Sequence, residues 1–201
     1  MDCSWGSGNE GCKGGWYSKA FSWVYLHSLR PESSYGPYLA QEGACHSNGE
    51  KKGATIDGFA YVPKRNNTAL KIAIAKYGTA AVSINTSPMT FKFYGWGIYD
   101  DPKCDDSDNS HTVLVVGYGI QRGTPYWLIK NSWSESWGIK GYAKIAWEQN
   151  RCGVTEKPIV VLTRHKKFQL PIKVKERTKQ PKKKRKTKQN ESFTRKIGKL
   201  S

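Results

Sequence analysis

Two segments in the first 80 residues repeat apolar side chains at the spacing of an amphipathic helix. Residues 17–29 predict a short helix, which ends near Arg30 because Pro31 disfavours helical backbone in the residue before it. Residues 68–76 predict a second helix, with Asn67 or Thr68 as its N-cap. The apolar positions of the two helices are Ala20, Phe21, Trp23, Val24 and Leu26, and then Leu70, Ile72, Ala73 and Ile74.

Short apolar runs separated by Gly, Asn and Asp dominate the chain after these helices, which is typical of strands. Residues 3–15 and 33–55 predict loops and irregular backbone. Helix early and sheet late indicate the α+β class, with a half-barrel or an antiparallel sheet. The predicted strands are residues 56–62, 80–84, 97–99, 112–118, 125–131 and 141–145.

Charge divides the chain into two parts of different character. Residues 163–201 contain 16 of the 33 Lys and Arg but 2 of the 16 Asp and Glu, a net charge of +14, which leaves +3 of the total +17 for residues 1–162. All eight Trp residues lie in that first part. High charge with few apolar side chains predicts a disordered basic tail over residues 163–201.

One run in this tail, from Pro181 to Lys186, resembles a nuclear-import signal that an acidic receptor groove would bind. Three interpretations stay open. The tail could bind an import receptor or, through phosphates, nucleic acid without sequence specificity. It could instead be a solvated charge run, or sequence added by a gene-model or splicing error. Phe168 and Phe193 are too sparse to form a stacking platform for bases.

Cysteine spacing argues against a zinc ribbon or finger, since no Cys-x-x-Cys pair occurs, and the sequence predicts neither a metal nor a cofactor. Wide spacing suits disulfides formed in an oxidising compartment, and an odd number leaves one thiol unpaired within the chain. Sequons at Asn66 and Asn85 fit a glycosylated secretory history. The first residues lack the pattern of a secretory signal, and no run of about 20 apolar residues predicts a membrane span.

Three motifs indicate a chemistry. Ser110-His111 precedes an apolar run that ends in Gly117-Tyr118-Gly119, and Asn131-Ser132-Trp133 follows with Trp137-Gly138 behind it. A glycine-rich loop, Gly11-Cys12-Lys13-Gly14-Gly15, lies near the N-terminus. In this order and at these intervals, the motifs resemble those of papain-like, cathepsin-type cysteine peptidases, and the resemblance extends over residues 2–162.

The resemblance implies roles for these residues. His111 would be the general base and acid, Asn131 would accept a hydrogen bond from its imidazole, and Trp133, beside the substrate, would shield that bond from water. Gly14 and Gly15 would lie along the substrate backbone, because a residue without a Cβ lets a peptide approach closely. The main specificity pocket would be lined by Trp16, Tyr17, Ser83 and Thr112.

A two-lobe fold is also implied by the resemblance. Residues 1–162 would form a partial peptidase domain, with 1–60 mainly a truncated helical left lobe and 61–162 mainly a largely intact β-rich right lobe. Cys3 would pair with Cys45 and Cys104 with Cys152. Cys12 would stay unpaired, because its family partner lies three residues before the nucleophile.

The family's nucleophile lies in a Gln…Cys-Gly-Ser-Cys-Trp segment, which does not occur in these 201 residues, and the oxyanion-hole glutamine belongs to the same segment. Met1 stands where the family has an interior residue, so we expect a truncated chain. The absence of a triad nucleophile costs on the order of 10⁶ in turnover in a serine system. We therefore expect no activity from this chain alone.

The leading interpretation is thus a partial cysteine endopeptidase that acts on peptide and protein substrates; no insertion resembles an occluding loop, which favours an endopeptidase. Two other classes stay open: a non-catalytic peptide-binding protein that keeps the groove, and a nuclear or nucleic-acid-associated protein that acts through its tail. Full-length members of the family are lysosomal or secreted, whereas the sequence leaves the location of this chain open.

Overall fold

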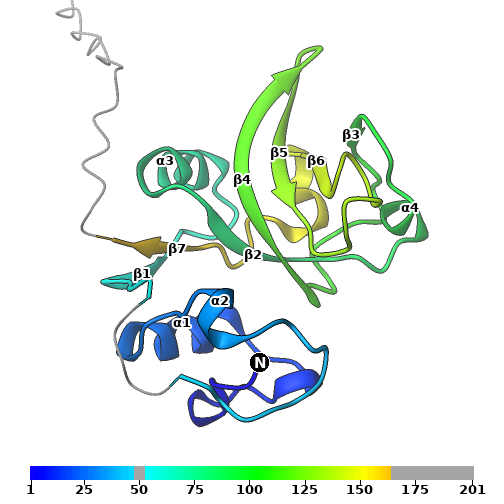
Figure 1. The fold of residues 1–201 in the computed structure, drawn as a ribbon. Helices are drawn as coiled ribbons and strands as arrows, with labels where there is room; N and C mark the ends of the chain where they lie inside the picture. Colours follow the sequence, from blue (N-terminus) through cyan, green and yellow to red (C-terminus); the bar gives the residue numbers. More distant parts are fainter. Residues whose placement is uncertain (48–52, 164–201) are drawn as a thin grey trace, which may run out of the picture. The chain divides into compact units, whose positions relative to one another are not determined.

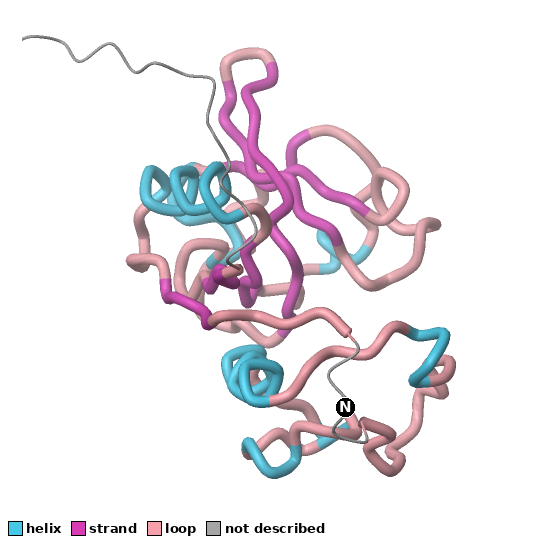
Figure 2. Tube along the Cα trace, turned by 60° about the vertical axis from the view of Figure 1, so that its left-hand side comes forward, coloured by secondary structure: helices cyan, strands magenta, loops and turns pink. Residues whose placement is uncertain are grey.

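The computed structural model describes residues 1–47 and 53–163, which combine short helices with one sheet (Figure 1). Its helices are α1 (Tyr17–Leu26), α2 (Glu32–Tyr35), α3 (Asn67–Tyr77) and α4 (Met89–Lys92), with 3₁₀ segments η1 (Trp5–Ser7), η2 (Gly11–Lys13) and η3 (Glu148–Gly153). Its strands are β1 (Gly58–Tyr61), β2 (Ala80–Ile84), β3 (Ile98–Tyr99), β4 (His111–Gln121), β5 (Thr124–Lys130), β6 (Tyr142–Ala146) and β7 (Ile159–Leu162). The tube in Figure 2 shows residues 1–47 as helix and loop, and the strands after them.

Seven strands in the described part of the chain form one sheet in the order β1-β7-β2-β4-β5-β6-β3. All neighbouring strands are antiparallel except β3, which pairs with β6 in parallel. Helices are few and the sheet follows most of them in the chain, so the predicted α+β class is confirmed. The expectation of an antiparallel sheet was wrong only for the short strand β3.

The longest strand pair is the hairpin of β4 and β5, which Figure 1 shows as a long curved ribbon. Its two-residue loop is Arg122-Gly123, and both residues have positive φ, 50° and 83°. A two-residue loop with two left-handed residues is the turn that matches the twist of a hairpin. Because β4 begins at His111 and β5 ends just before Asn131, the hairpin returns the second motif to the end where the first one lies.

The core lies in the sheet and on the face of α3 that packs against it. Every residue of β2 is buried, as expected of a strand between two neighbours, and Val113 and Val115 of β4 alternate with the half-exposed Leu114. Trp127 of β5 is 1% exposed and stacks on Trp147 at 4.5 Å between ring centroids. The helix contributes Leu70, Ala73 and Ile74 to the same cluster.

Residues 1–47 bury little apolar surface. Within this fully described stretch, Val24 is the one apolar side chain that is buried. Large apolar side chains lie exposed there instead: Trp5, Trp16, Tyr25, Leu26, Leu29, Tyr38 and Leu39. Burial of apolar surface is the main favourable contribution to folding, so this segment has little stability of its own.

Disulfides join Cys3 to Cys45 and Cys104 to Cys152. The first spans 42 residues and ties the N-terminal loop to the end of the irregular stretch; the second spans 48 residues and ties the segment before His111 to η3. Cys12 is a free, exposed cysteine.

Several element boundaries differ from the prediction. Asn66, not Asn67 or Thr68, is the N-cap of α3, since its side-chain oxygen accepts from the Ala69 backbone N–H at 2.8 Å. α1 ends at Leu26, three residues before the predicted end at residue 29. Residues 33–55, predicted as irregular, include most of α2, which follows Pro31, and the segment predicted as loop contains η1 and η2. The helices and strands predicted from the sequence do not include α4 and β7, which are too short for a periodic signal.

The predictions for residues 164–201, namely disorder, the import run and nucleic-acid binding, lie outside the described residues. The proposed lobe boundary at residue 60 also stays a prediction. Among the described residues, no helix combines the length and the apolar character needed to span a bilayer.

Candidate active site

His111 and Asn131 form a hydrogen-bonded pair at one end of the β4–β5 hairpin. The ring Nε2 of His111 lies 2.8 Å from the side-chain oxygen of Asn131. His111 is the first residue of β4, and Asn131 follows the last residue of β5, whose Lys130 pairs with Leu114. Strand pairing thus brings two residues that are 20 positions apart in the sequence to the same end of the hairpin.

The tautomer of His111 follows from the contacts of Asn131. The backbone N–H of Ser132 donates to the same Asn131 side-chain oxygen at 2.8 Å. Because a backbone N–H can only donate, the amide must present its oxygen at this point, and the oxygen can only accept from His111. The proton of a neutral imidazole therefore lies on Nε2, and Nδ1 keeps its lone pair as the basic nitrogen.

An aromatic cluster encloses this pair. The Trp133 ring lies 5.1 Å from the His111 ring, and Asn131 is 8% exposed. Behind Trp133, the fully buried Phe91 of α4 contacts both Trp133 and Trp137, at 5.9 and 5.3 Å between ring centroids. Exclusion of water strengthens a hydrogen bond, so the cluster stabilises the Nε2–oxygen contact. Phe91 was not predicted as part of the site, because a four-residue helix gives no pattern in the sequence.

The loop after Asn131 depends on two glycines with positive φ. The Asn131 backbone N–H donates to the Gly141 carbonyl at 2.9 Å, and Gly141 has φ of 83°. Gly138 has φ of 61°, and a Cβ there would lie 2.5 Å from the Tyr142 carbonyl oxygen. A side chain at Gly138 would therefore force the backbone that supports Asn131 to move.

Gly14 and Gly15 follow η2 but differ in their surroundings. A Cβ on Gly14 would meet no atom within 4 Å, although its φ of 111° disfavours any other residue. A Cβ on Gly15 would lie 2.4 Å from the side-chain oxygen of Asn9, which accepts from the Trp16 backbone N–H at 2.7 Å. Gly14 thus leaves open space for an approaching backbone, whereas Gly15 is required by the internal packing of its own loop.

The residues predicted to line the specificity pocket come from three elements. Ser83 of β2 pairs with Thr112 of β4, directly next to the pair of Ile84 and His111. Burial raises the pKa of the Tyr17 hydroxyl, and hydrogen bonding to Ser83 offsets part of that increase. The Tyr17 side chain of α1 therefore reaches Ser83 of β2, and the strand partner of Ser83, Thr112, directly follows His111 in the chain.

The sequence matches the model of the papain family cysteine proteases over residues 1–162. The chain belongs to the papain family. It is 45% identical over 149 residues to cathepsin K of Mus musculus, a match that covers 73% of this chain and 45% of that protein. It is 42% identical over 157 residues to a cathepsin L-like peptidase of Aedes aegypti, covering 77% of this chain and 46% of that protein.

Solved structures of the family agree with the fold. Digestive procathepsin L 3 of the Tenebrio molitor larval midgut superposes with a TM-score of 0.76 at 36% identity, covering 81% of this chain and 53% of that one. The proform of the ragweed pollen cysteine protease Amb a 11 superposes with a TM-score of 0.73 at 33% identity, covering 81% of this chain and 50% of that one. The chain therefore spans about half the length of the relatives that it matches, and the papain-like fold is confirmed.

No group of three or more His, Cys, Asp or Glu side chains is placed to hold a metal ion in residues 1–47 and 53–163.

We expect the tautomer of His111 to be visible by NMR at alkaline pH. Long-range ¹H–¹⁵N correlations should show the His111 proton on Nε2, and Asn131→Ala should give a mixture of tautomers because the accepting oxygen is lost. His27 serves as an internal control: its Nδ1 lies 2.9 Å from the Trp23 carbonyl, which requires the opposite tautomer. A His111 ring protonated on Nδ1 would contradict the assignment.

Proposed function

We propose that this chain supplies the histidine–asparagine half of a thiol peptidase site, whose complete form hydrolyses internal peptide bonds of proteins. The observation that supports the proposal is the 2.8 Å contact of His111 Nε2 with Asn131, which leaves Nδ1 basic. Papain-family membership over residues 1–162 supports the reaction class.

In the proposed reaction, His111 Nδ1 takes the proton of a cysteine thiol, and the thiolate attacks the peptide carbonyl. The imidazolium that forms is stabilised by Asn131, and it then gives its proton to the leaving amine. The acyl-enzyme is hydrolysed by water, with His111 again as the base. Gly14 lies in open space where an extended substrate backbone can approach.

In this proposal, the thiol comes from a segment outside these 201 residues. No Gln…Cys-Gly-Ser-Cys-Trp segment occurs in them, and the one free cysteine among the described residues, Cys12, is exposed with its Sγ 3.8 Å from the Met1 sulfur. No hydrogen bond joins this thiol to His111 in the described part of the chain. Without a thiolate that is paired with His111, acyl-enzyme formation has no starting point.

We expect the purified 201-residue chain to leave fluorogenic peptides intact. The measurement is the rate of fluorescence release, compared between the chain, His111→Ala and Cys12→Ser. All three should equal the rate of buffer alone. Hydrolysis by the chain that disappears in His111→Ala would contradict the expected inactivity, and its loss in Cys12→Ser would identify Cys12 as the nucleophile.

A fusion protein tests the reaction class itself. In this fusion, which we call the joined protein, a papain-family segment that contains Gln…Cys-Gly-Ser-Cys-Trp precedes Met1 of this chain. Hydrolysis by the joined protein supports the proposal, because the added segment supplies the cysteine and the oxyanion-hole glutamine, and residues 1–162 supply the remaining groups of the site. A folded joined protein that leaves all peptides intact would overturn it.

A further inference from the structure

We propose that Asn66 is a glycan acceptor site of the folded chain, whereas the fold closes the second sequon, at Asn85, to the same modification. The group that Asn66 takes is an oligosaccharide, transferred from a lipid-linked oligosaccharide diphosphate. Both segments, Asn66-Asn67-Thr68 and Asn85-Thr86-Ser87, carry the acceptor pattern, so the sequence alone does not separate them. The inference goes beyond the proposed peptidase reaction, because it concerns other residues and a different chemistry.

Asn66 presents its side-chain nitrogen to solvent. The residue is exposed, and so is Thr68, whose hydroxyl completes the sequon. The side-chain oxygen of Asn66 accepts from the Ala69 backbone N–H at 2.8 Å, and no hydrogen bond within the described part of the chain uses its Nδ2. A glycan is bulky and hydrophilic, so it requires an Asn at the surface with a free side-chain nitrogen. Asn66 meets both requirements.

The modification leaves the N-cap of α3 in place. In the transfer, Nδ2 loses a proton and forms a bond with the anomeric carbon of the first sugar. The bond from that carbon to the diphosphate oxygen breaks, and the lipid diphosphate leaves with the electron pair. The product is still an amide, so the Asn66 side-chain oxygen can keep its contact with the Ala69 N–H. The glycan and the capped helix are therefore compatible.

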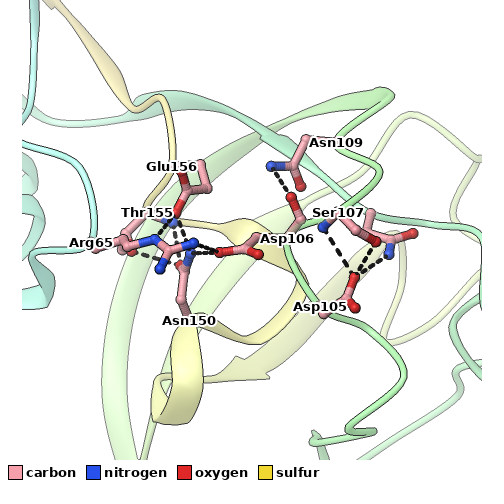
Figure 3. A network of polar contacts seen from close by, with 9 residues as sticks. Arg65, Asp105, Asp106, Ser107, Asn109, Asn150, Thr155 and Glu156 are labelled. Atoms are coloured by element: carbon pink, nitrogen blue, oxygen red, sulfur yellow. Dashed lines mark hydrogen bonds and ion pairs between the residues drawn. The ribbon is translucent and has the colours of Figure 1, made fainter.

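Arg65 fixes the backbone just before Asn66. It has a φ of 53°, and its backbone N–H donates to the Thr155 carbonyl at 2.8 Å. Figure 3 shows the Arg65 guanidinium between Glu156 and Asp106, and its Nε lies 2.6 Å from Glu156 Oε1. These contacts hold the residue before the sequon, whereas the sequon itself enters the first turn of α3. Because helix ends fray, this turn can open for a transferase while Arg65 stays attached.

Asn85 is built into the interior instead. It is 3% exposed, its Nδ2 donates to Asp105 at 3.4 Å, and its side-chain oxygen accepts from the Ser87 backbone N–H at 2.9 Å. Its backbone N–H donates to the carbonyl of Cys152, which is disulfide-bonded to Cys104, and both cysteines are fully buried. A glycan on Nδ2 would require the amide to leave this place and to break its hydrogen bonds. The native packing and a glycan at Asn85 therefore exclude each other.

The disulfides support the chemistry of this modification. Disulfides form and persist in oxidising compartments such as the secretory route, which is also where Asn-x-Ser/Thr segments are glycosylated. The Cys104–Cys152 crosslink closes the packing around Asn85 but does not involve Asn66. Disulfide formation and glycan transfer consequently compete at Asn85 and are compatible at Asn66.

Glycan transfer in vitro tests the inference. The 201-residue chain, produced in bacteria with both disulfides formed, is incubated with a purified oligosaccharyltransferase and a lipid-linked oligosaccharide. A peptide N-glycosidase in ¹⁸O-water then converts each glycosylated Asn to labelled Asp, which mass spectrometry locates in individual peptides. We expect about tenfold more label at Asn66 than at Asn85, because modification of Asn85 requires its buried hydrogen bonds to break. Detection in individual peptides also separates both sites from the sequon at Asn190, which lies outside the described residues.

A second state of the same chain shows whether the fold is what closes Asn85. Reduction and carboxymethylation of the cysteines removes both disulfides and prevents the packing around Cys104 and Cys152. In this state, we expect the label at Asn85 to rise to a level similar to that at Asn66. Near-UV circular dichroism should show native packing before the treatment and its loss afterwards.

Variants identify the acceptor in the native chain. Thr68→Ala should abolish the label at Asn66 and leave the N-cap intact, and Asn66→Asp should do the same, since a carboxylate also accepts from the Ala69 N–H. Ser87→Ala is the matched control, because it removes the other sequon and should leave the label at Asn66 unchanged.

Three results would each overturn the inference: a native chain without label at Asn66, equal label at Asn66 and Asn85 in the native chain, or a carboxymethylated chain in which Asn85 stays unlabelled. The last result would mean that something other than the fold protects Asn85. None of these measurements involves peptide hydrolysis, so the glycan site and the peptidase proposal can fail separately.

Discussion

His111→Ala should lower kcat/KM of the joined protein on the order of 10⁶-fold, if a thiol site loses as much as a serine site does. The imidazole has two tasks in the proposed reaction, removal of the thiol proton and protonation of the leaving amine, and Ala can do neither. The 2.8 Å contact with Asn131 fixes the ring for both tasks. The measurement is hydrolysis of a fluorogenic peptide at saturating and limiting substrate.

Asn131→Ala is the companion variant in this experiment. This variant keeps the His111 imidazole and removes the oxygen that accepts its Nε2 proton. We expect a smaller loss of kcat/KM than in His111→Ala, and mainly in kcat, because the substrate contacts are unchanged while the ring loses its fixed tautomer. Lys76→Met, remote from the pair on α3, should retain full activity. A joined protein whose rate is the same with Ala at position 111 would show that another group acts as the base.

Removal of the Cys104–Cys152 disulfide should lower the free energy of unfolding by about 4 kcal/mol, the loop-closure value for a crosslink that spans 48 residues. Both side chains are fully buried in the core cluster, so Cys104→Ala with Cys152→Ala also leaves space behind. Urea denaturation followed by near-UV circular dichroism measures the change. Cys104 lies seven residues before His111, so we also expect the His111 ring to be less ordered in the double variant.

The Cys3–Cys45 disulfide is the matched control, because its span of 42 residues gives nearly the same loop-closure value. It lies in residues 1–47, where Val24 is the buried apolar side chain and most large apolar groups are exposed. We therefore expect Cys3→Ala with Cys45→Ala to leave the unfolding midpoint of the sheet nearly unchanged. Equal losses from both double variants would mean that the two regions unfold as one unit.

The sheet strands and the longer helices could be predicted from local pattern. Short apolar runs bounded by Gly, Asn and Asp located β4 and β5, and apolar residues at helical spacing located α3, because each of these elements buries apolar side chains that are close together in the sequence. The N-cap was wrong by one residue, since Asn66, Asn67 and Thr68 are all good caps by type and only the hydrogen bond to Ala69 separates them. The four-residue helix α4 was missed because one turn is too short to show a period.

The sequence by itself marked His111 and Asn131 as candidate catalytic residues, because they lie in two motifs in order and at a fitting interval. Strand pairing then brings the two side chains together. The tautomer of His111 and the packing of Phe91 behind Trp133 were decided only by the tertiary structure. Each depends on contacts between residues that are separated in the sequence, such as Phe91 and Trp133. Local pattern contains no information about such contacts, because they form only when the packing of the whole sheet fixes where its loops meet.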